Sequence, residues 1–164
     1  MTALARFRSP LGPLSVEVTE TGLCGLLIDP DGARARPAVT AAAREHLEAT
    51  LAALADYFAG RPPVLPALDL RGSAFDLVVW NALITIPYGE TLTYGELAAR
   101  IGKPSASRAV GAANGRNPVA ILVPCHRVVA SGGALGGYAG GLARKRWLLA
   151  HEAGHSRALR AIGP

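Results

Sequence analysis

Short extended runs separated by turns occupy the first thirty residues. The runs are LARFR, LSVEV and GLCGLLI; SPLGP, rich in turn residues, separates the first two, and DPDG follows the third. Short runs bounded by turn residues are typical of neighbouring antiparallel strands. The pattern therefore predicts a small antiparallel sheet at the start of the chain.

An apolar stripe with helical spacing follows in TAAAREHLEATLAALADYFAG. The stripe consists of Leu47, Leu51, Leu54 and Phe58. Spacings of three and four residues place these side chains on one face of a helix, which Gly60 and the two prolines after it end. The aperiodic, Pro-rich RPPVLPALDLRGS then predicts a boundary between a first domain at 1–70 and a second domain at 71–164.

Helical patterns dominate the second domain. SAFDLVVWNALITI is helix-like and ends at Pro87. In TLTYGELAARIG, Thr93 and Glu96 have the spacing of a capping box, and Leu97 and Ile101 form the expected buried face. After the turn GKPS, the run SASRAVGAANG predicts a second short helix, so the two helices form a helix-turn-helix.

The second helix of this pair combines small residues with one long cation, Arg108. The small residues are Ala109, Gly111, Ala112 and Ala113. A smooth helix with one projecting Arg suits close approach to a DNA groove. A tightly packed core helix has the same composition, and the sequence leaves that alternative open.

A candidate nucleophile follows an apolar run. Residues 121–123 predict a buried strand, and Pro124 favours extended geometry in the residue before it. Cys125 then lies at the end of that strand, directly before His126. A thiol attacks carbon as the thiolate, which a nearby base or positive charge promotes. Adjacent side chains of an extended chain point to opposite sides, so a turn or a bridging water must bring His126 to Cys125.

A base of this kind needs an orienting group, usually a carboxylate. Glu152, in the helical run GLARKRWLLAHEAG, is the only acidic residue from position 100 onward. It follows Leu148 by four positions, so an inward Leu148 carries Glu152 inward as well. The His126 imidazole would satisfy such a buried carboxylate. Cys125, His126 and Glu152 form a candidate catalytic group, with chance adjacency as the alternative.

Charge is distributed unevenly along the chain. The 164 residues are 50% apolar and 18% charged, with a formal net charge of +5, which is typical of a globular protein. Residues 1–99 carry a net charge of −4 and residues 100–164 a net charge of +9. A basic half beside an acidic half indicates a surface that binds a polyanion, most often nucleic acid.

Two cysteines are too few for a disulfide framework, and Cys24 is interpreted as an inert core thiol. No apolar run reaches the length of a membrane span, and the first residues predict a strand and no signal peptide. We expect a cytoplasmic protein that does not associate with membranes.

Several motifs in order resemble one known family. The run PCHRVV, preceded by RAVGAANGRNP and followed by GGYAGGLARKRWLLAHE, is similar to the O⁶-alkylguanine-DNA alkyltransferases. The resemblance is dense over 73–155 and looser in the first domain, where SPLGPL and the helix ending in YFAG are similar to bacterial members. It implies an α/β first domain that is RNase H-like, and a mostly α-helical second domain with the helix-turn-helix and a short wing.

The resemblance also implies an activity. An alkyl group would pass irreversibly from O⁶ of guanine in DNA, and less readily from O⁴ of thymine, to Cys125, which consumes the protein. His126 would activate Cys125 through a water, and Glu152 would hold His126. Asn117 would be the hinge between the recognition helix and the active-site strand. Neither a metal nor a cofactor is expected, because a thiolate displaces the alkyl carbon directly.

The expected partner is double-stranded DNA that contains alkylated guanine, bound through its minor groove after the target base has been flipped out. By resemblance, Arg108 would fill the hole in the base stack, and Tyr94 would contact the guanine edge and the flanking phosphate. The remaining residues expected to contact DNA or the base are Ser107, Ala109, Ala112, Arg116, Val128, Tyr138 and Ala139. The resemblance implies a monomer, with cooperative binding along DNA left open.

The sequence departs from the family in two places. Ala139 stands where relatives often carry a polar side chain, so only its amide could serve O⁶. Some members hold a structural zinc through N-terminal Cys and His residues; here Cys24 and His46 are the only such residues in the first domain, so no zinc is expected.

Three alternatives remain at this point. His151 to His155 reads HEAGH, the zinc-protease pattern H-E-x-x-H, although Gly154 is expected to end the helix and separate the two histidines. A hydrolase could use the Cys-His-Glu group with repeated turnover. A non-catalytic protein that binds alkyl lesions could share the fold, but relatives of that kind lack the cysteine.

Overall fold

The computed structural model describes residues 2–28, 31–32 and 34–162, with residues 158–162 described by their backbone alone. The chain divides into two compact units. The first comprises Met1–Arg71 and Pro118–Leu122, and the second comprises Gly72–Asn117 and Val123–Pro164.

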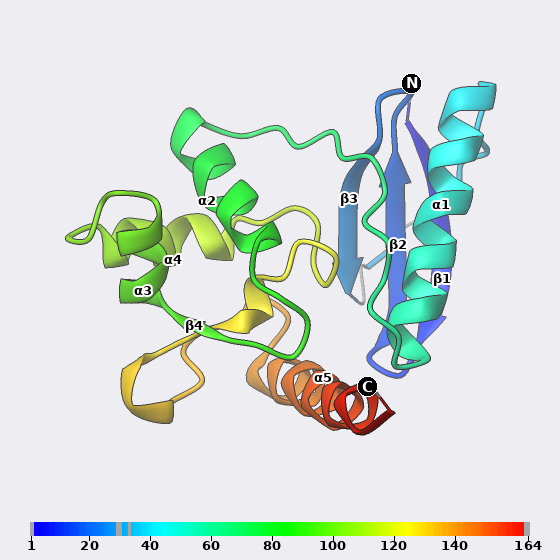
Figure 1. Cartoon of the computed structure of the whole chain (residues 1–164). Coiled ribbons are helices and arrows are strands. Elements are labelled where there is room, and N and C mark those ends of the chain that lie inside the picture. The colour runs from blue at the N-terminus through cyan, green and yellow to red at the C-terminus, as the bar shows by residue number, and fades with distance from the viewer. Residues whose placement is uncertain (1, 29–30, 33, 163–164) are drawn as a thin grey trace. The chain divides into compact units, whose positions relative to one another are not determined.

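The first unit is built on the antiparallel sheet that the sequence predicts. Its strands β1 (Ala3–Ser9), β2 (Gly12–Val18) and β3 (Leu23–Ile28) lie in the order β1-β2-β3 (Figure 1). The β1–β2 register runs from Ala3 opposite Val18 to Ser9 opposite Gly12. Fully buried side chains of β2 and β3 form the core of the unit, so the predicted meander is confirmed.

Helix α1 (Ala41–Phe58) packs against the sheet of this unit. The Thr40 side chain caps it by accepting from the Ala43 amide. The predicted stripe is only partly correct, because Leu54 is buried but Leu47, Leu51 and Phe58 are half-buried. Thr50 and Tyr57 are buried in addition. The Thr50 hydroxyl donates to the His46 carbonyl at 2.8 Å, so burial of this polar residue leaves no unpaired donor.

Two segments without regular secondary structure pair with β3. In the predicted linker, the Leu23 amide donates to Ala67 O and the Asp69 amide to Leu23 O, each at 2.8 Å. From much later in the chain, Pro118 O accepts from the Leu26 amide at 2.9 Å, and the Ala120 amide donates to Leu26 O at 3.0 Å. The segment Pro118–Leu122 is therefore part of the first unit.

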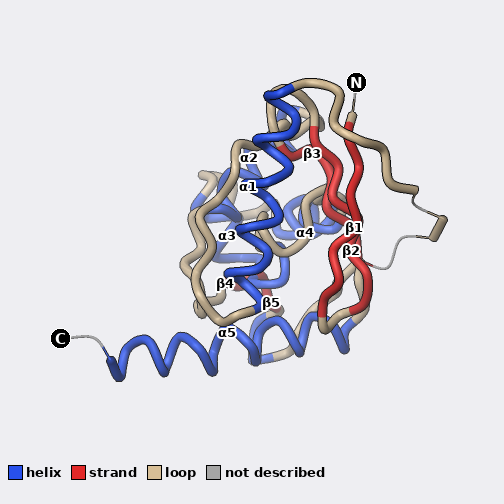
Figure 2. Tube along the Cα trace, turned by 90° about the vertical axis from the view of Figure 1, so that its right-hand side faces the viewer, coloured by secondary structure: helices blue, strands red, loops and turns tan. Residues whose placement is uncertain are grey.

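The second unit is mainly helical (Figure 2). Its helices are α2 (Ala74–Ile84), α3 (Tyr94–Arg100), α4 (Ser107–Gly115) and α5 (Leu142–Ile162). Strands β4 (Leu92–Thr93) and β5 (Val128–Val129) form one short parallel pair. Capping boxes start α2 at Ser73 and α3 at Thr93, which confirms the box expected at Thr93. Leu97 is fully buried and Ile101 half-buried.

Two predictions about the second half of the sequence are wrong. Residues 121–123 are buried but form a turn and no strand. Ile121 has a φ of 71°, and the Leu122 amide donates to Ala120 O at 2.8 Å. Left-handed backbone at a β-branched residue is rare, so the apolar run gave no sign of it. Helix α5 also continues through Gly154, because a single glycine weakens a helix without having to end it.

Among the described residues, no helix is both long enough and apolar enough to cross a membrane.

Candidate active site

Cys125 opens a short 3-10 helix, η1 (Cys125–Arg127), in the place where the sequence predicted the end of a strand. The Cys125 amide donates to Val123 O at 2.8 Å, and the Arg127 amide donates to Pro124 O at 3.0 Å. The thiol-bearing residue is 7% exposed. A turn of the kind that the sequence required therefore begins at Cys125, in place of a straight strand end.

Burial raises the pKa of the Cys125 thiol, so the sulfur is protonated at rest. Four neighbours act on the pKa of Cys125 in the opposite direction. These are a hydrogen bond from the Asn117 side chain, the backbone amides of Cys125 and His126, and the charge of Lys145. The surroundings therefore shield the thiol from bulk solvent and still supply donors and a cation that would stabilise a thiolate.

His126 lies against Glu152, as the sequence predicted. Its Nε2 is 2.6 Å from Glu152 Oε1, and both side chains are almost completely inaccessible. Leu148 is also fully buried, so the inward face of α5 carries Glu152 as expected.

Arg127 completes this network from the other side of the carboxylate. Its Nε donates to Glu152 Oε2 at 2.8 Å, its Nη2 to Oε1 at 3.0 Å and its Nη1 to Ile86 O at 2.7 Å. The Gly89 amide adds a further bond to Oε2 at 3.2 Å. Burial acts to raise the pKa of Glu152, but its bonds to His126 and Arg127 outweigh burial and lower the pKa to about 2.

Burial also lowers the pKa of His126 below its usual 6.5. The His126 ring therefore supports the Glu152 carboxylate through its hydrogen bond, and Arg127 adds hydrogen bonds and a fixed positive charge. The carboxylate in turn accepts from the Nε2–H of the neutral ring, which places the lone pair of the imidazole on Nδ1. A neutral imidazole of this kind can accept a proton.

Lys145 is a fully buried cation beside the same cysteine. Its Nζ donates to Val128 O at 2.6 Å and to Gly137 O at 3.0 Å. It also lies 6.0 Å from the centre of the Tyr94 ring, within the range of a cation–π contact. The two carbonyls replace much of the hydration that an ammonium loses on burial.

Tyr94, at the start of α3, fits against two glycines. A Cβ on Gly136 would lie 2.9 Å from the Tyr94 hydroxyl, and Gly136 has a φ of +71°. A Cβ on Gly111 of α4 would lie 3.6 Å from the ring. Burial raises the pKa of the sequence-predicted Tyr94 and Tyr138, and a thiolate at Cys125 would raise the pKa of both further. Both tyrosines therefore lie near the thiol.

The residues expected to contact DNA are mostly accessible on α4. Arg108, Ala109 and Ala112 are exposed and Ser107 is half-buried, whereas Val110 and Ala113 are buried. The helix thus has a smooth outer face with a projecting Arg, and an inner packed face. In the loop after β5, Ala139 is exposed.

Arg116 differs from the other expected DNA contacts because it is already paired. Its Nε and Nη2 donate to Asp76 Oδ1 at 3.0 and 2.6 Å, while the side chain stays half-exposed. The pair connects the end of α4 to the start of α2. Much of its positive charge is therefore balanced within the protein.

The H-E-x-x-H pattern does not form a metal site in the part of the chain that the structure describes. No group of three potential ligands occurs among those residues. His151 and His155 do share a helix face, with ring centres 4.4 Å apart, but Glu152 between them is bonded to His126 and Arg127. Because of these bonds, Glu152 is not available as the general base that the zinc-protease pattern requires, whereas the helix end expected at Gly154 is not found.

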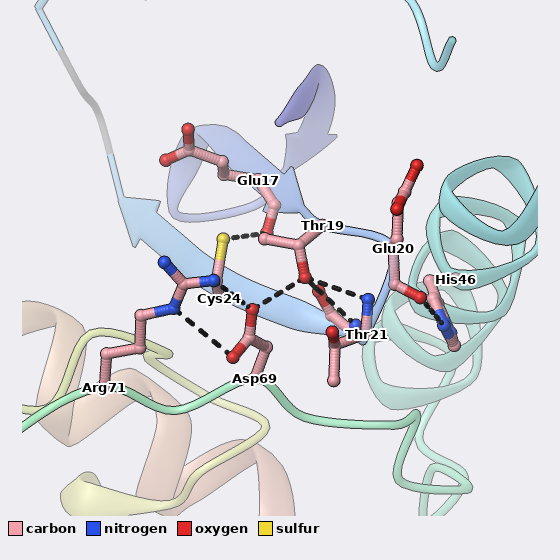
Figure 3. A network of polar contacts seen from close by, with 9 residues as sticks. Glu17, Thr19, Glu20, Thr21, Cys24, His46, Asp69 and Arg71 are labelled. Atoms are coloured by element: carbon pink, nitrogen blue, oxygen red, sulfur yellow. Dashed lines mark hydrogen bonds and ion pairs between the residues drawn. The ribbon is translucent and has the colours of Figure 1, made fainter. Parts of the chain in front are cut away.

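Cys24, in the first unit, has a different environment (Figure 3). Its thiol donates to Glu17 O at 3.3 Å. Burial, followed by the charges of Glu17 and Asp69, raises its pKa. The charge of Arg71, which is 2.8 Å from Asp69, and the backbone amide of Cys24 act on this pKa in the opposite direction but do not outweigh burial. Cys24 is half-buried, whereas Cys125 is buried.

Comparison with known families identifies this arrangement. A family model described as "6-O-methylguanine DNA methyltransferase, DNA binding domain" matches residues 74–163, more than half of the chain. The chain belongs to this family.

Relatives within the family agree in sequence and in fold. The methylated-DNA–protein-cysteine methyltransferase of Mycolicibacterium paratuberculosis is 60% identical over 106 residues, which cover 64% of this chain and 64% of that protein. The match thus spans less than two thirds of the relative's length. A crystal structure of Mycobacterium tuberculosis O⁶-methylguanine methyltransferase is 42% identical, covers 94% of both chains and has a TM-score of 0.81. The M. tuberculosis OGT in complex with DNA is 44% identical over 92% of both chains, with a TM-score of 0.81.

Three residues at the centre of this methyltransferase-family site were not predicted from the sequence. Arg127 and Lys145 were not singled out, and neither was Asn114, whose Nδ2 lies 3.3 Å from Cys125 O. A signal for Lys145 was present: it precedes Leu148 by three positions and Glu152 by seven, so it belongs to the same helix face. Nothing in the sequence indicated that Arg127, which follows His126, would donate to the Glu152 carboxylate.

Proposed function

We propose that the protein repairs alkylated DNA by transferring an alkyl group from O⁶ of guanine to Cys125, once per molecule. The observation that carries the proposal is the buried Cys125, which directly precedes His126 in the chain. His126 Nε2 is 2.6 Å from Glu152 Oε1. The name of the M. paratuberculosis relative supports the reaction, and the DNA complex of the M. tuberculosis relative supports the partner. O⁴-alkylthymine is proposed as a poorer substrate.

In the proposed step, the Cys125 thiol loses its proton through a bridging water to Nδ1 of His126. Sulfur forms a bond to the alkyl carbon, and the bond from that carbon to O⁶ breaks. The proton held by the His126 imidazolium then returns through water to N1 of the leaving guanine, which leaves His126 neutral. Asn117, the two backbone amides and Lys145 favour the thiolate, and Glu152 stabilises the imidazolium. Neither a metal nor a cofactor takes part.

DNA recognition follows from where the chemistry must occur. An alkyl group on O⁶ inside a duplex is out of reach, so the nucleotide must be flipped out of the stack. We propose that the Arg108 side chain fills the space that the flipped nucleotide leaves in the base stack, and that Tyr94 rotates the flanking phosphate. The exposed small residues of α4 would let the helix lie close in the minor groove. Arg116 donates to Asp76 through Nε and Nη2, and it would contact a phosphate through Nη1.

The base would lie against Tyr138, Ala139 and two carbonyl groups. Alkylation at O⁶ removes the N1 proton of guanine, so the 2-amino group is the hydrogen-bond donor that remains on that edge. We propose that Cys125 O and Val128 O accept from this amine. The Ala139 amide would donate to O⁶, since its side chain has no polar atom.

We further propose that the protein acts in the cytoplasm as a monomer. The RNase H-like character of the first unit and a wing in the loop after β5 stay proposals of the family resemblance.

Stoichiometry tests the proposed function. With a duplex that contains one O⁶-methylguanine, the demethylated product should appear in a burst and stop at one equivalent per chain. The intact mass should increase by one methyl group in place of a hydrogen, on the peptide that contains Cys125. Product well beyond one equivalent, with unmodified protein recovered, would contradict the proposal and favour a hydrolase, whose intermediate water can cleave.

A further inference from the structure

Asn114 is a buried amide in the last turn of α4, and no step of the proposed reaction uses it. Its Nδ2 donates to Cys125 O at 3.3 Å, and the residue is 5% exposed. Its Oδ1 is buried and has no hydrogen-bond partner among the described residues. An apolar side chain of the same size would avoid burying an unpaired acceptor, so packing alone does not explain an amide at this position.

The bond to Cys125 fixes the orientation of both groups. A carbonyl oxygen can only accept, so the amide must present Nδ2 to it. A carbonyl also has two lone pairs, and one hydrogen bond fixes its direction while a second donor can still bind. Val128 O is held in the same way, by Lys145 Nζ at 2.6 Å. Both carbonyls proposed to face the guanine amine are therefore held by a buried side chain from a helix.

Helix α4 is itself fixed at the end that carries Asn114. The Trp80 indole Nε1 donates to Ala113 O at 2.8 Å, and the Asn117 amide Nδ2 donates to Val123 O at 2.8 Å. Arg108 lies on the exposed face of the same helix. The inner face of the proposed recognition helix thus bonds directly to the acceptor residue.

We infer that Asn114 is a positioning residue that orients the carbonyl of Cys125 toward the 2-amino group of the target guanine. The inference rests on the proposed function. It assigns to α4 a second role besides contact with DNA, namely selection of bases that carry an amine at C2. Neither bond making nor proton transfer passes through Asn114.

Two substrates that differ only in the amine test the inference. Single-turnover transfer rates are measured on one duplex with O⁶-methylguanine and on the same duplex with O⁶-methylhypoxanthine, which lacks the 2-amino group. The wild type should prefer methylguanine. In Asn114→Leu this preference should shrink by about threefold to tenfold, the size of one hydrogen bond, through slower reaction of methylguanine. Asn114→Ala, which also removes the donor, should reduce the preference to a similar extent.

The ratio of two rates from one preparation does not depend on how much of a variant has folded. Asn81→Ala is the matched control, because Asn81 is exposed on α2 and donates within its own helix to Leu77 O at 2.9 Å. The ratio of rates for this variant should equal that of the wild type. Equal slowing of both substrates in the Asn114 variants, or a wild type without preference for the amine, would overturn the inference. A wild type that fails to demethylate O⁶-methylguanine would instead overturn the proposed function.

Discussion

At the scale of single residues, the chemistry depends on how a thiol behaves after burial. Burial raises the pKa of Cys125, and the surrounding donors and Lys145 oppose that effect. A thiol in such a place does not react indiscriminately, because it becomes a thiolate only when a base removes its proton. The same burial keeps His126 neutral, so it is ready to accept that proton.

Replacing the sulfur separates binding from reaction. Cys125→Ser should abolish methyl transfer, since an unactivated hydroxyl is a much poorer nucleophile. Affinity for a duplex with O⁶-methylguanine should stay within about twofold of the wild type, because phosphate contacts dominate DNA binding. Rapid-quench transfer and fluorescence anisotropy measure the two quantities. Any methyl transfer by the Ser variant would show that another residue is the acceptor.

The pH profile reports the state of His126. Because burial lowers its pKa below 6.5, the imidazole stays neutral above that value, and the single-turnover rate should be level there. The rate should fall only at more acid pH, as His126 takes a proton. The unfolded chain binds this proton more readily than the folded chain, so stability should also rise with pH up to about 6.5.

Stopped-flow rates and urea unfolding across the pH range check both expectations. His46→Gln is the control, since His46 lies in the first unit and should leave the profile unchanged. A rate that rises tenfold per pH unit above neutrality would contradict the role of His126, because it would mean that free hydroxide deprotonates the thiol. An inflection above 6.5 would do so as well.

At the scale of elements, α4 has two distinct faces. Val110 and Ala113 pack inward, whereas Arg108 and Ala112 are exposed. This division settles the choice between a core helix and a surface helix that the composition left open. The exposed face is available to a partner, and the packed face bonds through Asn114 to the turn that contains Cys125.

The exposed Arg108 should matter only when a base must be flipped. Arg108→Ala should slow transfer from duplex DNA by about tenfold or more, since an unfilled stack costs a few kcal/mol. Transfer from the free base O⁶-benzylguanine should change little. Arg100→Ala is the control for loss of one charge, because Arg100 is exposed on α3 and bonds to Thr85. Equal losses on both substrates would contradict the proposed role.

The elements that were predicted correctly have local signals. The spacing of Thr93 and Glu96 predicts the start of a helix, and turn residues mark the ends of the first three strands. The failures at Ile121 and Gly154 have a tertiary cause. A left-handed residue such as Ile121 is retained because surrounding contacts determine it, which no propensity encodes. Gly154 shows the converse, a breaker inside an element that packing holds together.

Some site residues could be predicted from the sequence and others could not, again because only local signals are visible in a sequence. His126 and Glu152 could be paired because each is conspicuous alone, an imidazole next to the thiol and the one carboxylate on an inward helix face. Lys145 and Asn114 were missed because their role lies in bonds to backbone carbonyls. A sequence does not show which carbonyls a buried side chain will reach.

At the scale of the whole molecule, the first unit is formed from two separate stretches of the sequence. The chain leaves the first unit at Arg71, forms α2 to α4, returns for Pro118–Leu122 and leaves again three residues before Cys125. In the first unit, Leu26 bonds to both Pro118 and Ala120, and Val119 and Ile121 are buried. Cys125 thus lies three residues after a segment that belongs to the first unit.

Because the first unit contains residues from both sides of the linker, the two fragments produced by a single cut in the linker should stay associated. If a protease site inserted within 61–72 is cleaved, the C-terminal fragment still carries residues 118–122, so the fragments should co-elute in native size-exclusion chromatography and separate only in denaturant. Expression of residues 72–164 alone should give an aggregation-prone product, because those five residues lose their strand partner. Separation of the nicked fragments without denaturant would contradict this expectation. Fragment complementation, with both pieces supplied together, should then restore methyl transfer to Cys125.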